Sequence, residues 1–223
     1  MWVPHVSLLR HGIPQIFSPA LSLNAAANQI NTAGFAYDAA GNLANDTFHA
    51  YTYDAEGNVT AVDRGSTAQY FYNALNQRIR TVVGSTATEF VFNEAGKRVS
   101  IWNGSTQAQI QGQYYWGAKP VAFYASGVTN FQYQGWVGTE SQNTSYNGYV
   151  LGDFTSLPFG DDQDAYHFAG LDRDYESDTD HPQFRQYSNA QGRFMSPDPM
   201  AEAITQATRR ASTVCLCDEQ SAE

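Results

Sequence analysis

The chain has 223 residues, of which 14% are aromatic and only 15% are charged, and its formal net charge is −10 at pH 7. This composition suits β-strands, whose half-buried surfaces favour aromatic side chains, and it argues against a helical bundle or a disordered chain. A strongly negative chain repels a phosphate backbone, so we expect no nucleic-acid partner.

Residues 1–27 form the first segment and lack the repeat that dominates the rest of the chain, so we expect this segment to be irregular. Pro4 and His5 stand where a signal peptide has a basic end followed by an apolar core, and no signal peptide is predicted. No apolar run approaches the about 20 residues that cross a bilayer as a helix. The sequence therefore predicts no membrane-spanning segment, and it leaves the cellular location open.

A short phrase recurs between residues 28 and 150: an aromatic residue, Asp or Asn, two variable residues, then Gly or Asn. Its four copies begin at Tyr37, Tyr53, Tyr72 and Phe92, which are 16, 19 and 20 residues apart. Self-similarity at a nearly fixed period is the signature of a stacked repeat architecture. The repeat therefore sets the plan of the fold.

Each copy of the phrase is expected to form a tight turn. Asp or Asn at the first position accepts hydrogen bonds from backbone N–H groups ahead of it, and Gly or Asn three residues later tolerates the left-handed conformation that closes the turn. The predicted turn residues are Asp38, Gly41, Asp54, Gly57, Asn73, Asn76, Asn93 and Gly96. The flanking segments QYFYN, TEFVFN and RVSIWN alternate in the manner of strands. Because one hairpin is only marginally stable in water, we expect the hairpins to pair edge to edge in a continuing antiparallel sheet.

The phrase YDxxGxL/V resembles the YD repeats of Rhs proteins, teneurins and the C component of insecticidal toxin complexes. Residues 151–200 resemble the Rhs repeat-associated core more specifically, through TSLPFGD and then HFAGLDRDYES and FRQYSNAQGRFMSPDP. The residues on positions of this core motif include Gly170, Arg173, Asp174, Glu176, Gly192, Arg193, Phe194, Pro197, Asp198 and Pro199. The chain is thus similar to a C-terminal fragment of a longer Rhs protein.

The core motif departs from the family pattern at two places. Asp178-Thr179 stands where the family has Gly-Leu, and His181-Pro182 occupies an aromatic strand position. Proline cannot donate a hydrogen bond to a neighbouring strand, so we expect this strand to lie at an edge or to be partly broken.

The resemblance implies an all-β fold, in which antiparallel YD-repeat hairpins form part of a curved, cocoon-like shell. In bacterial members this shell encloses a toxic C-terminal domain, and family members are secreted or displayed at the cell surface. The partners implied for the chain are the rest of a longer Rhs shell or its toxin domain. The first expected function is therefore structural, as a fragment of a shell that encapsulates and delivers a toxin in bacterial competition.

Several family members also carry an aspartyl-type protease that cuts the toxin free, and this protease requires two Asp residues, each followed by Pro. Asp198-Pro199 matches the first of these contexts, whereas residues 201–223 contain no second Asp-Pro. One carboxyl of such a dyad stays protonated while the other is ionised, so a single Asp does not suffice. We therefore expect Asp198 to belong to a rigid turn and the chain not to be an enzyme. In the divergent tail we expect a short helix or disorder.

A second function remains open, in which the chain is a carbohydrate- or cell-surface-binding YD-repeat module. Trp102, Trp116 and Trp136 are candidates for stacking on the sugar rings of glycans. Neither a metal site nor a cofactor site is predicted. The acidic residues between positions 172 and 180 lack the glycine turn and the terminal Glu of a calcium-binding loop.

Overall fold

The computed structural model describes residues 21–24, 26–160 and 168–198, in which the regular structure is strand apart from two short 3-10 turns, η1 (Asp63–Gly65) and η2 (Phe168–Gly170). Every strand pair among these residues is antiparallel. The predicted all-β antiparallel class is confirmed.

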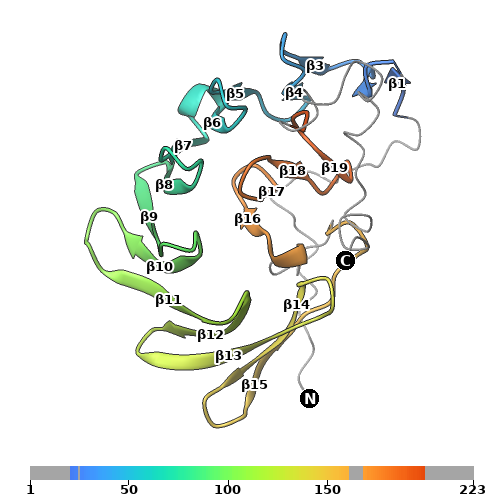
Figure 1. The fold of residues 1–223 in the computed structure, drawn as a ribbon. Helices are drawn as coiled ribbons and strands as arrows, with labels where there is room; N and C mark the ends of the chain where they lie inside the picture. The colour runs from blue at the N-terminus through green and yellow to red at the C-terminus, as the bar shows by residue number, and fades with distance from the viewer. Residues whose placement is uncertain (1–20, 25, 161–167, 199–223) are drawn as a thin grey trace, which may run out of the picture.

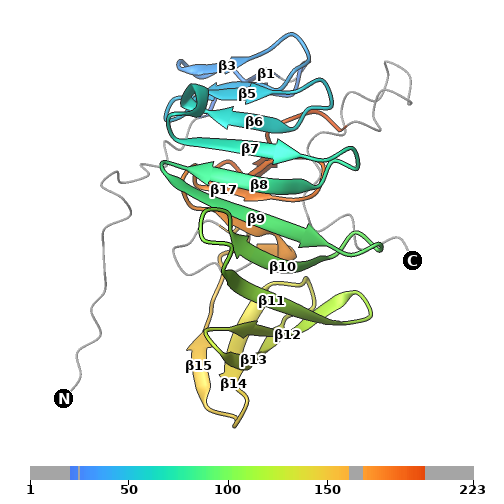
Figure 2. The ribbon, with the colours of Figure 1, turned by 90° about the vertical axis from the view of Figure 1, so that its left-hand side faces the viewer.

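The largest sheet is a meander of eleven strands, in which each strand pairs with the next one in the chain. Its strands are β5 (Tyr51–Tyr53), β6 (Val59–Val62), β7 (Ala68–Tyr72), β8 (Arg78–Val83), β9 (Thr86–Phe92), β10 (Arg98–Asn103), β11 (Gln109–Trp116), β12 (Lys119–Ala125), β13 (Val128–Gln134), β14 (Glu140–Ser145) and β15 (Val150–Asp153). We call this sheet the strip. Figures 1 and 2 show the strip bent into an open arc that does not close into a barrel.

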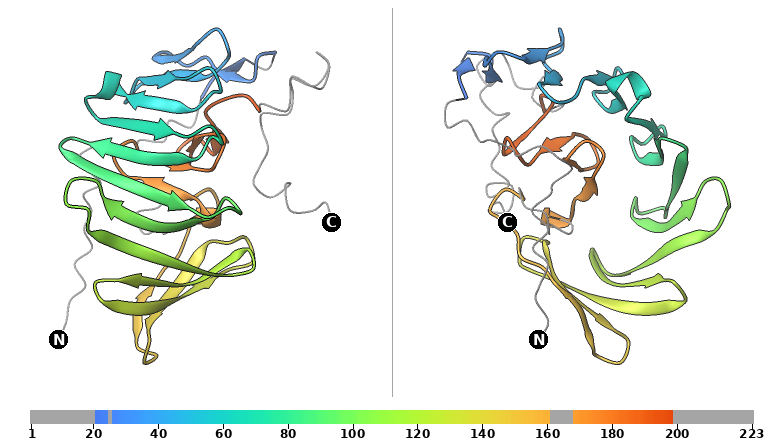
Figure 3. Two further views of the ribbon diagram at one scale, coloured as in Figure 1. Left: turned by 60° about the vertical axis from the view of Figure 1, so that its left-hand side comes forward. Right: turned by 180° about the vertical axis from the view of Figure 1, so that it is seen from behind.

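Three smaller sheets complete the described fold. Their strands are β1 (Leu23–Asn24) with β2 (Gln29–Ile30), β3 (Phe35–Tyr37) with β4 (Leu43–Asp46), and β16 (Asp172–Asp174), β17 (Thr179–His181), β18 (Tyr187–Ser188) and β19 (Arg193–Phe194). The last four strands form one sheet, the core sheet, which lies inside the arc of the strip (Figures 1 and 3). The strip therefore has a concave face toward the core sheet and a convex face away from it.

The four predicted turns form by the expected chemistry, as the first of them shows. Asp38 Oδ1 accepts hydrogen bonds from the backbone N–H groups of Ala40 and Asn42 at 2.9 and 2.8 Å. Gly41 closes the turn at φ +90°. The same side-chain contacts recur at Asp54, Asn73 and Asn93, and the same left-handed conformation recurs at Gly57, Asn76 and Gly96. Local side-chain chemistry therefore dictates these turns.

The first hairpin is not part of the strip, so the expectation of one continuing sheet is wrong at this point. β3 and β4 form a sheet of their own, joined to β5 by a single bridge between Asn45 and Ala50. Thr47 adopts φ +81°, and Asp46 Oδ1 accepts a hydrogen bond from the His49 backbone at 2.8 Å. This turn ends β4 before it can pair along the length of β5.

Strands lie close to both expected limits of the repeat region, residues 28 and 150. Leu23–Asn24, which was expected to be irregular, pairs with β2 as a strand. At the other end β15 crosses position 150 and continues to Asp153. Residues 1–20 and the tail at 201–223 lie outside the described residues.

The strand that precedes Pro182 is interrupted, as its proline predicts. β17 stops at His181, and it pairs with β18 through Asp180 and Tyr187 alone. The strand does not lie at an edge, however, because β16 and β18 flank it on both sides.

Two small hydrophobic clusters hold these parts together. The first joins strands β4–β7 to the residue that follows β19 and consists of Leu43, Tyr51, Val59, Val62, Ala68, Tyr70 and Met195. The second lies within the core sheet and consists of Phe168, Tyr187 and Phe194. Because Met195 comes directly after β19, the first cluster is complete only when the last described segment reaches β4 to β7.

Candidate functional site

The last described segment meets β4 and the concave face of the strip through polar contacts that follow the order of the chain. These contacts are Leu43 N to Met195 O at 2.7 Å, Tyr70 to Glu176 at 2.7 Å, Arg78 to Asp174 at 2.7 and 2.6 Å, Arg98 to Asp172 at 2.7 Å, and Ala169 N to Thr139 Oγ1 at 3.0 Å. As the residue number rises from 43 to 139 on one side, it falls from 195 to 169 on the other. The segment therefore runs back along the strip from its far end to its beginning.

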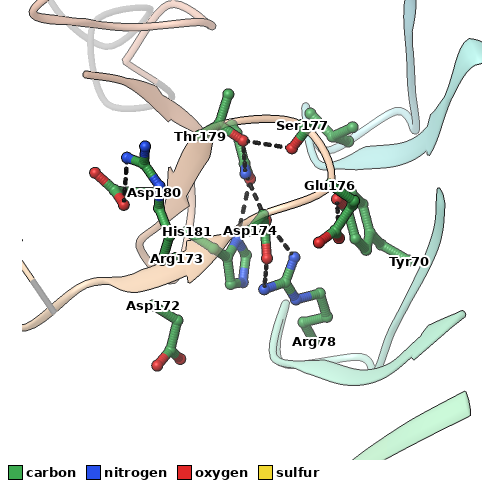
Figure 4. A network of polar contacts seen from close by, with 12 residues as sticks. Tyr70, Arg78, Asp172, Arg173, Asp174, Glu176, Ser177, Thr179, Asp180 and His181 are labelled. Atoms are coloured by element: carbon green, nitrogen blue, oxygen red, sulfur yellow. Dashed lines mark hydrogen bonds and ion pairs between the residues drawn. The ribbon is translucent and has the colours of Figure 1, made fainter. Parts of the chain in front are cut away.

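A buried ion pair between Arg78 of β8 and Asp174 of β16 lies at the centre of this contact (Figure 4). Both side chains are 5% exposed, and the guanidinium donates two hydrogen bonds to the carboxylate. Burial disfavours the charged guanidinium, but the charge of Asp174 outweighs this effect, and the pKa of Arg78 is raised. The guanidinium also lies 4.6 Å from the ring centroid of Tyr70. Since an unpaired buried charge is costly, Arg78 and Asp174 depend on each other.

An amide connects this ion pair to a histidine. Gln186 Nε2 donates hydrogen bonds to Asp174 at 2.6 Å and to Thr179 at 2.7 Å. Its Oε1 then remains to accept a hydrogen bond from His181 Nδ1 at 3.2 Å. The orientation of Gln186 therefore places the proton of a neutral imidazole on Nδ1.

His181 faces the strip directly. Its ring packs edge-on against the ring of Tyr72 in β7, with the centroids 5.9 Å apart. Burial lowers the pKa of His181 to about 4, and the positive charge of Arg78 adds to this effect. The imidazole is therefore neutral at pH 7.

Glu176 makes a further contact between the core segment and the strip, since its Oε1 accepts a hydrogen bond from the Tyr70 hydroxyl. Burial raises the pKa of Glu176, and the negative charge of Asp174 raises it further. Burial also raises the pKa of Tyr70 far above its ordinary value. We call the side chains of Tyr70, Tyr72, Arg78, Arg98, Asp172, Asp174, Glu176 and His181 the docking interface.

The opposite face of the core sheet holds a second group of charges. Arg173 and Asp180 are register partners there, and their side chains form an ion pair at 3.4 Å, while Arg173 also bonds to Asp178. Burial raises the pKa of Asp180 to about 7, although Arg173 works in the other direction. This carboxyl belongs to the interior of the core segment and not to the docking interface.

The remaining residues of the core motif hold the last described residues, up to Asp198, in place. Arg193 donates a hydrogen bond to the carbonyl oxygen of Asn28 at 2.5 Å, and Phe194 is buried. A Cβ atom at Gly41 would come within 3.1 Å of Pro197, so the glycine permits this close approach. Positive φ angles are adopted by Gly170 and Gly192. Pro199 lies outside the described residues.

Asp198, the residue that matches the family protease, forms an ion pair with Arg185 at 3.3 Å. Arg185 in turn lies over the ring of Phe194, with its guanidinium carbon 3.7 Å from the centroid. A proteolytic dyad instead needs a second carboxyl within reach of the same water. Asp198 follows a bend at Met195 and Ser196, and its described ion pair is with Arg185.

The three candidate tryptophans do not form one platform. Trp116 and Trp136 are 83% and 85% exposed. Trp116 is the last residue of β11 and Trp136 lies in the turn after β13, so both are on the same rim of the strip. Trp102 is partly buried near the end of β10, on the opposite rim. The structure therefore brings two of the three residues to one rim and separates the third.

Sequence reasoning missed the strip side of the docking interface, although the repeat carries a signal for it. Two places after the turn Gly or Asn, the first two copies have Leu43 and Val59, both buried. The third and fourth copies have Arg78 and Arg98 at this position. A charged residue in a buried position of a repeat indicates a buried partner of opposite charge.

Among the described residues, His, Cys, Asp and Glu side chains nowhere gather in threes as a metal site requires. Within the same residues there is no helix long and apolar enough to span a membrane.

No protein-family model matches the chain. By sequence the chain is similar to the tRNA3(Ser)-specific nuclease WapA of Bacillus spizizenii, with 22% identity over 210 residues. This similarity covers 87% of the chain but only 9% of the nuclease.

By structure the chain is similar to TcdB2-TccC3. It superimposes on the TcdB2-TccC3-TEV crystal structure with a TM-score of 0.55 and 15% identity, over 73% of this chain and 10% of that one. The Photorhabdus luminescens Tc holotoxin pore, with a mutated TccC3, superimposes with a TM-score of 0.55 and 15% identity, over 78% of this chain and 10% of that one. The TcdB2-TccC3-Cdc42 crystal structure superimposes with a TM-score of 0.53 and 16% identity, over 73% of this chain and 10% of that one.

The chain shares its fold with part of TcdB2-TccC3. It spans about a tenth of the length of these relatives. At this level of identity the similarity shows a common fold.

Proposed function

We propose that this chain is a non-catalytic part of a YD-repeat shell of the Rhs type, which encloses and delivers a toxin domain in bacterial competition. The observation that carries the proposal is the strip bent around a core sheet and tied to it by the buried pair of Arg78 and Asp174. The fold shared with TcdB2-TccC3 and the sequence similarity to a nuclease toxin support it.

The concave face beyond the core sheet also suits an inner wall. Register places Gln113, Gln132 and Asn143 on the same face as Tyr70. Gln113 bonds to Gln132 at 2.6 Å, and the two amides of Gln132 and Asn143 donate to Glu140 at 3.1 and 2.8 Å. Polar side chains that already hydrogen-bond to one another, and that form no apolar patch, bind an enclosed polypeptide only weakly. Weak binding of this kind suits the inner wall of a shell around a toxin domain.

A chimera tests the proposal. Residues 28–198 would replace the structurally matching segment of TccC3, and the chimera would be produced together with TcdB2. We expect it to assemble and to keep its C-terminal domain resistant to added protease, whereas an Arg78→Glu chimera should lose this resistance. A chimera that assembles but leaves the domain as sensitive as the free domain would contradict the proposal.

The proposal includes the absence of self-cleavage. Asp198 is paired with Arg185, and the sequence offers no second Asp-Pro. We expect the intact mass of the purified chain to stay constant on incubation at pH 5 and at pH 7, for the wild type and for Asp198→Asn alike. A C-terminal truncation that appears in the wild type and vanishes in Asp198→Asn would show that the chain cleaves itself.

A second candidate function is glycan binding at one rim of the strip. The observation that favours it is the exposure of Trp116 and Trp136 on neighbouring hairpins, since exposed indole rings stack well on apolar faces. Titration with neutral oligosaccharides should quench tryptophan fluorescence in a saturable way. Replacing Trp116 and Trp136 by Ala should abolish the response, while Trp102→Ala should leave it intact. A linear, non-saturable response would exclude this function.

A further inference from the structure

We propose that the docking interface is an acid-sensitive latch, in which protonation of His181 loosens the core sheet from the strip. The two surfaces are parts of one chain, so the event is a change of conformation and needs no partner. The inference concerns the stability of one contact and holds whether or not the chain is part of a shell.

The hydrogen bonds around His181 fix where an added proton must go. Because Gln186 Nε2 donates to Asp174 and Thr179, Gln186 Oε1 accepts the hydrogen bond from His181 Nδ1–H, which keeps the proton of the neutral ring on Nδ1. The second proton must therefore go to Nε2. The ring lies against the strip, with Tyr72 at its edge (Figure 4 shows His181 beside Arg78 and Asp174).

The two carboxylates that face His181 are already paired with arginines. Arg78 from β8 faces it, and so do Asp172 and Asp174 from β16, while Tyr72 from β7 is uncharged at neutral pH. Asp174 is held by two hydrogen bonds from Arg78, and Asp172 is held in the same way by Arg98. Because each of these two carboxylates is already paired with a guanidinium group, a proton on His181 adds a further positive charge beside Arg78 in a partly buried contact, which is unfavourable.

The direction of the titration agrees with this geometry. The pKa of His181 is about 4 in the docked state and 6.5 for an ordinary histidine. The undocked state therefore binds the proton more tightly, and docking weakens as the pH falls from about 6.5 to about 4.

Two other carboxyls near His181, those of Glu176 and Asp180, have raised pKa values, and they differ in their effect on docking. Burial and the charge of Asp174 raise the pKa of Glu176 in the docked state, although its hydrogen bond from Tyr70 works in the other direction. Through this carboxyl, acid therefore favours the docked state and opposes the latch. Asp180 lies on the other face of the core sheet, where its contacts are with Arg173 and Asn189, and the charge of Asp174 is the one influence on it from the docking interface. Glu176 is thus the carboxyl of the interface that opposes His181, and Asp180 acts mainly within the core sheet.

Hydrogen exchange on the intact 223-residue chain tests the latch. Two backbone amides report docking directly, because Leu43 N–H donates to Met195 O and Ala169 N–H donates to Thr139 Oγ1. Between pH 7.5 and pH 5 the protection factors of these amides should fall roughly tenfold or more in the wild type. Amides paired within the strip, such as that of Thr81, should keep theirs.

Two variants should respond in opposite directions. His181→Gln keeps an amide that can bond to Gln186 but cannot gain a proton, so the acid-induced loss of protection should vanish. Glu176→Gln removes the carboxyl whose titration opposes that of His181, so the acid-induced loss of amide protection should become larger than in the wild type. His49→Gln, at a histidine of the β4–β5 turn paired with Asp63, is the control and should behave as the wild type. A loss of protection that persists in His181→Gln would overturn the proposal.

The wild-type chain alone provides a check that needs no variant. An NMR titration of the imidazole resonances should show one histidine that titrates below pH 5. If all five histidines of the chain titrate between pH 6 and pH 7, the latch does not exist.

Discussion

Arg78 and Arg80 are only two residues apart in β8, yet they lie on opposite faces of the strip. The register with β7 shifts between them, because Tyr72 is opposite Arg78 and Phe71 is opposite Arg80. This bulge turns Arg78 toward the core sheet and leaves Arg80 half exposed on the convex face, where it meets Glu89 at 3.5 Å. The two arginines form a natural pair for comparison.

Removing one partner of a buried ion pair leaves the other charge without compensation. We therefore expect Arg78→Ala to lower the free energy of unfolding by about 3–5 kcal/mol. Arg80→Ala removes a surface pair and should cost less than about 1 kcal/mol. Urea denaturation followed by tryptophan fluorescence measures both values. Equal effects of the two substitutions would show that the docking interface does not stabilise the fold.

Gly57 isolates the backbone contribution of a repeat turn. It adopts φ +86°, and a Cβ atom added there would meet nothing within 4 Å. The cost of Gly57→Ala is thus the cost of the left-handed conformation alone, about 1–2 kcal/mol in thermal or urea unfolding. Gly57→Asn should cost less, because Asn tolerates this region, as Asn76 does at φ +57° in the third turn. A neutral Gly57→Ala would contradict this account.

At the scale of the element, β17 carries two neighbouring groups whose titrations oppose each other. Asp180 has a pKa of about 7 in the native state, against 3.8 ordinarily, so its contribution to stability falls as the pH rises from about 4 to about 7. His181 has a pKa of about 4, against 6.5, so its contribution rises with pH between about 4 and 6.5. Over the shared range the two slopes, each about 1.4 kcal/mol per pH unit, nearly cancel.

Asp180→Asn, made in the Glu176→Gln background so that this second raised carboxyl does not oppose the histidine, should uncover the slope of the histidine. We expect the free energy of unfolding of this double variant to increase with pH between 4 and 6.5, whereas that of the wild type does not increase. Urea denaturation at half-unit steps of pH provides the measurement. Asp153→Asn changes an exposed carboxylate of β15 and should keep the wild-type profile. A level profile in the double variant would show that the two shifts do not oppose each other.

The elements that could be predicted from the sequence are those whose partners are local. Asp38 bonds to a backbone four residues ahead, so the phrase itself contains the turn. The docking interface could not be predicted in the same way, because Arg78 and Asp174 are 96 residues apart in the sequence. Neither the spacing of the repeat nor the residue type indicates which acidic residue pairs with Arg78. The break between β4 and β5 also escaped prediction, because Thr47 adopts a left-handed conformation that threonine rarely takes.

At the scale of the whole molecule, the strip ends in a strand with a neighbour on one side among the described residues. This strand, β15, carries Val150 and Leu151, and Leu151 is 58% exposed. An exposed apolar edge is a template for pairing with a second copy of the chain. We expect sedimentation velocity to show concentration-dependent association, which Leu151→Lys should reduce.

The control for this experiment is Leu75→Lys. Leu75 is 69% exposed but lies in the turn between β7 and β8, away from any free strand edge. Its substitution adds the same charge and should leave the association unchanged. A wild-type chain that remains monomeric at all concentrations would show that the edge of β15 does not pair.

The reversed order of the contacts between the strip and the last described segment has a consequence for the path of folding. The contact of Ala169 with Thr139 closes a loop of 30 residues, and the successive contacts outside it span 74, 96 and 106 residues. Each closure is nested in the next, so once the innermost one has formed, every further step adds little loop entropy. The molecule can therefore fold as one large hairpin that zips outward from Thr139. Its N-terminal strands are the last to be secured, when Met195 reaches Leu43.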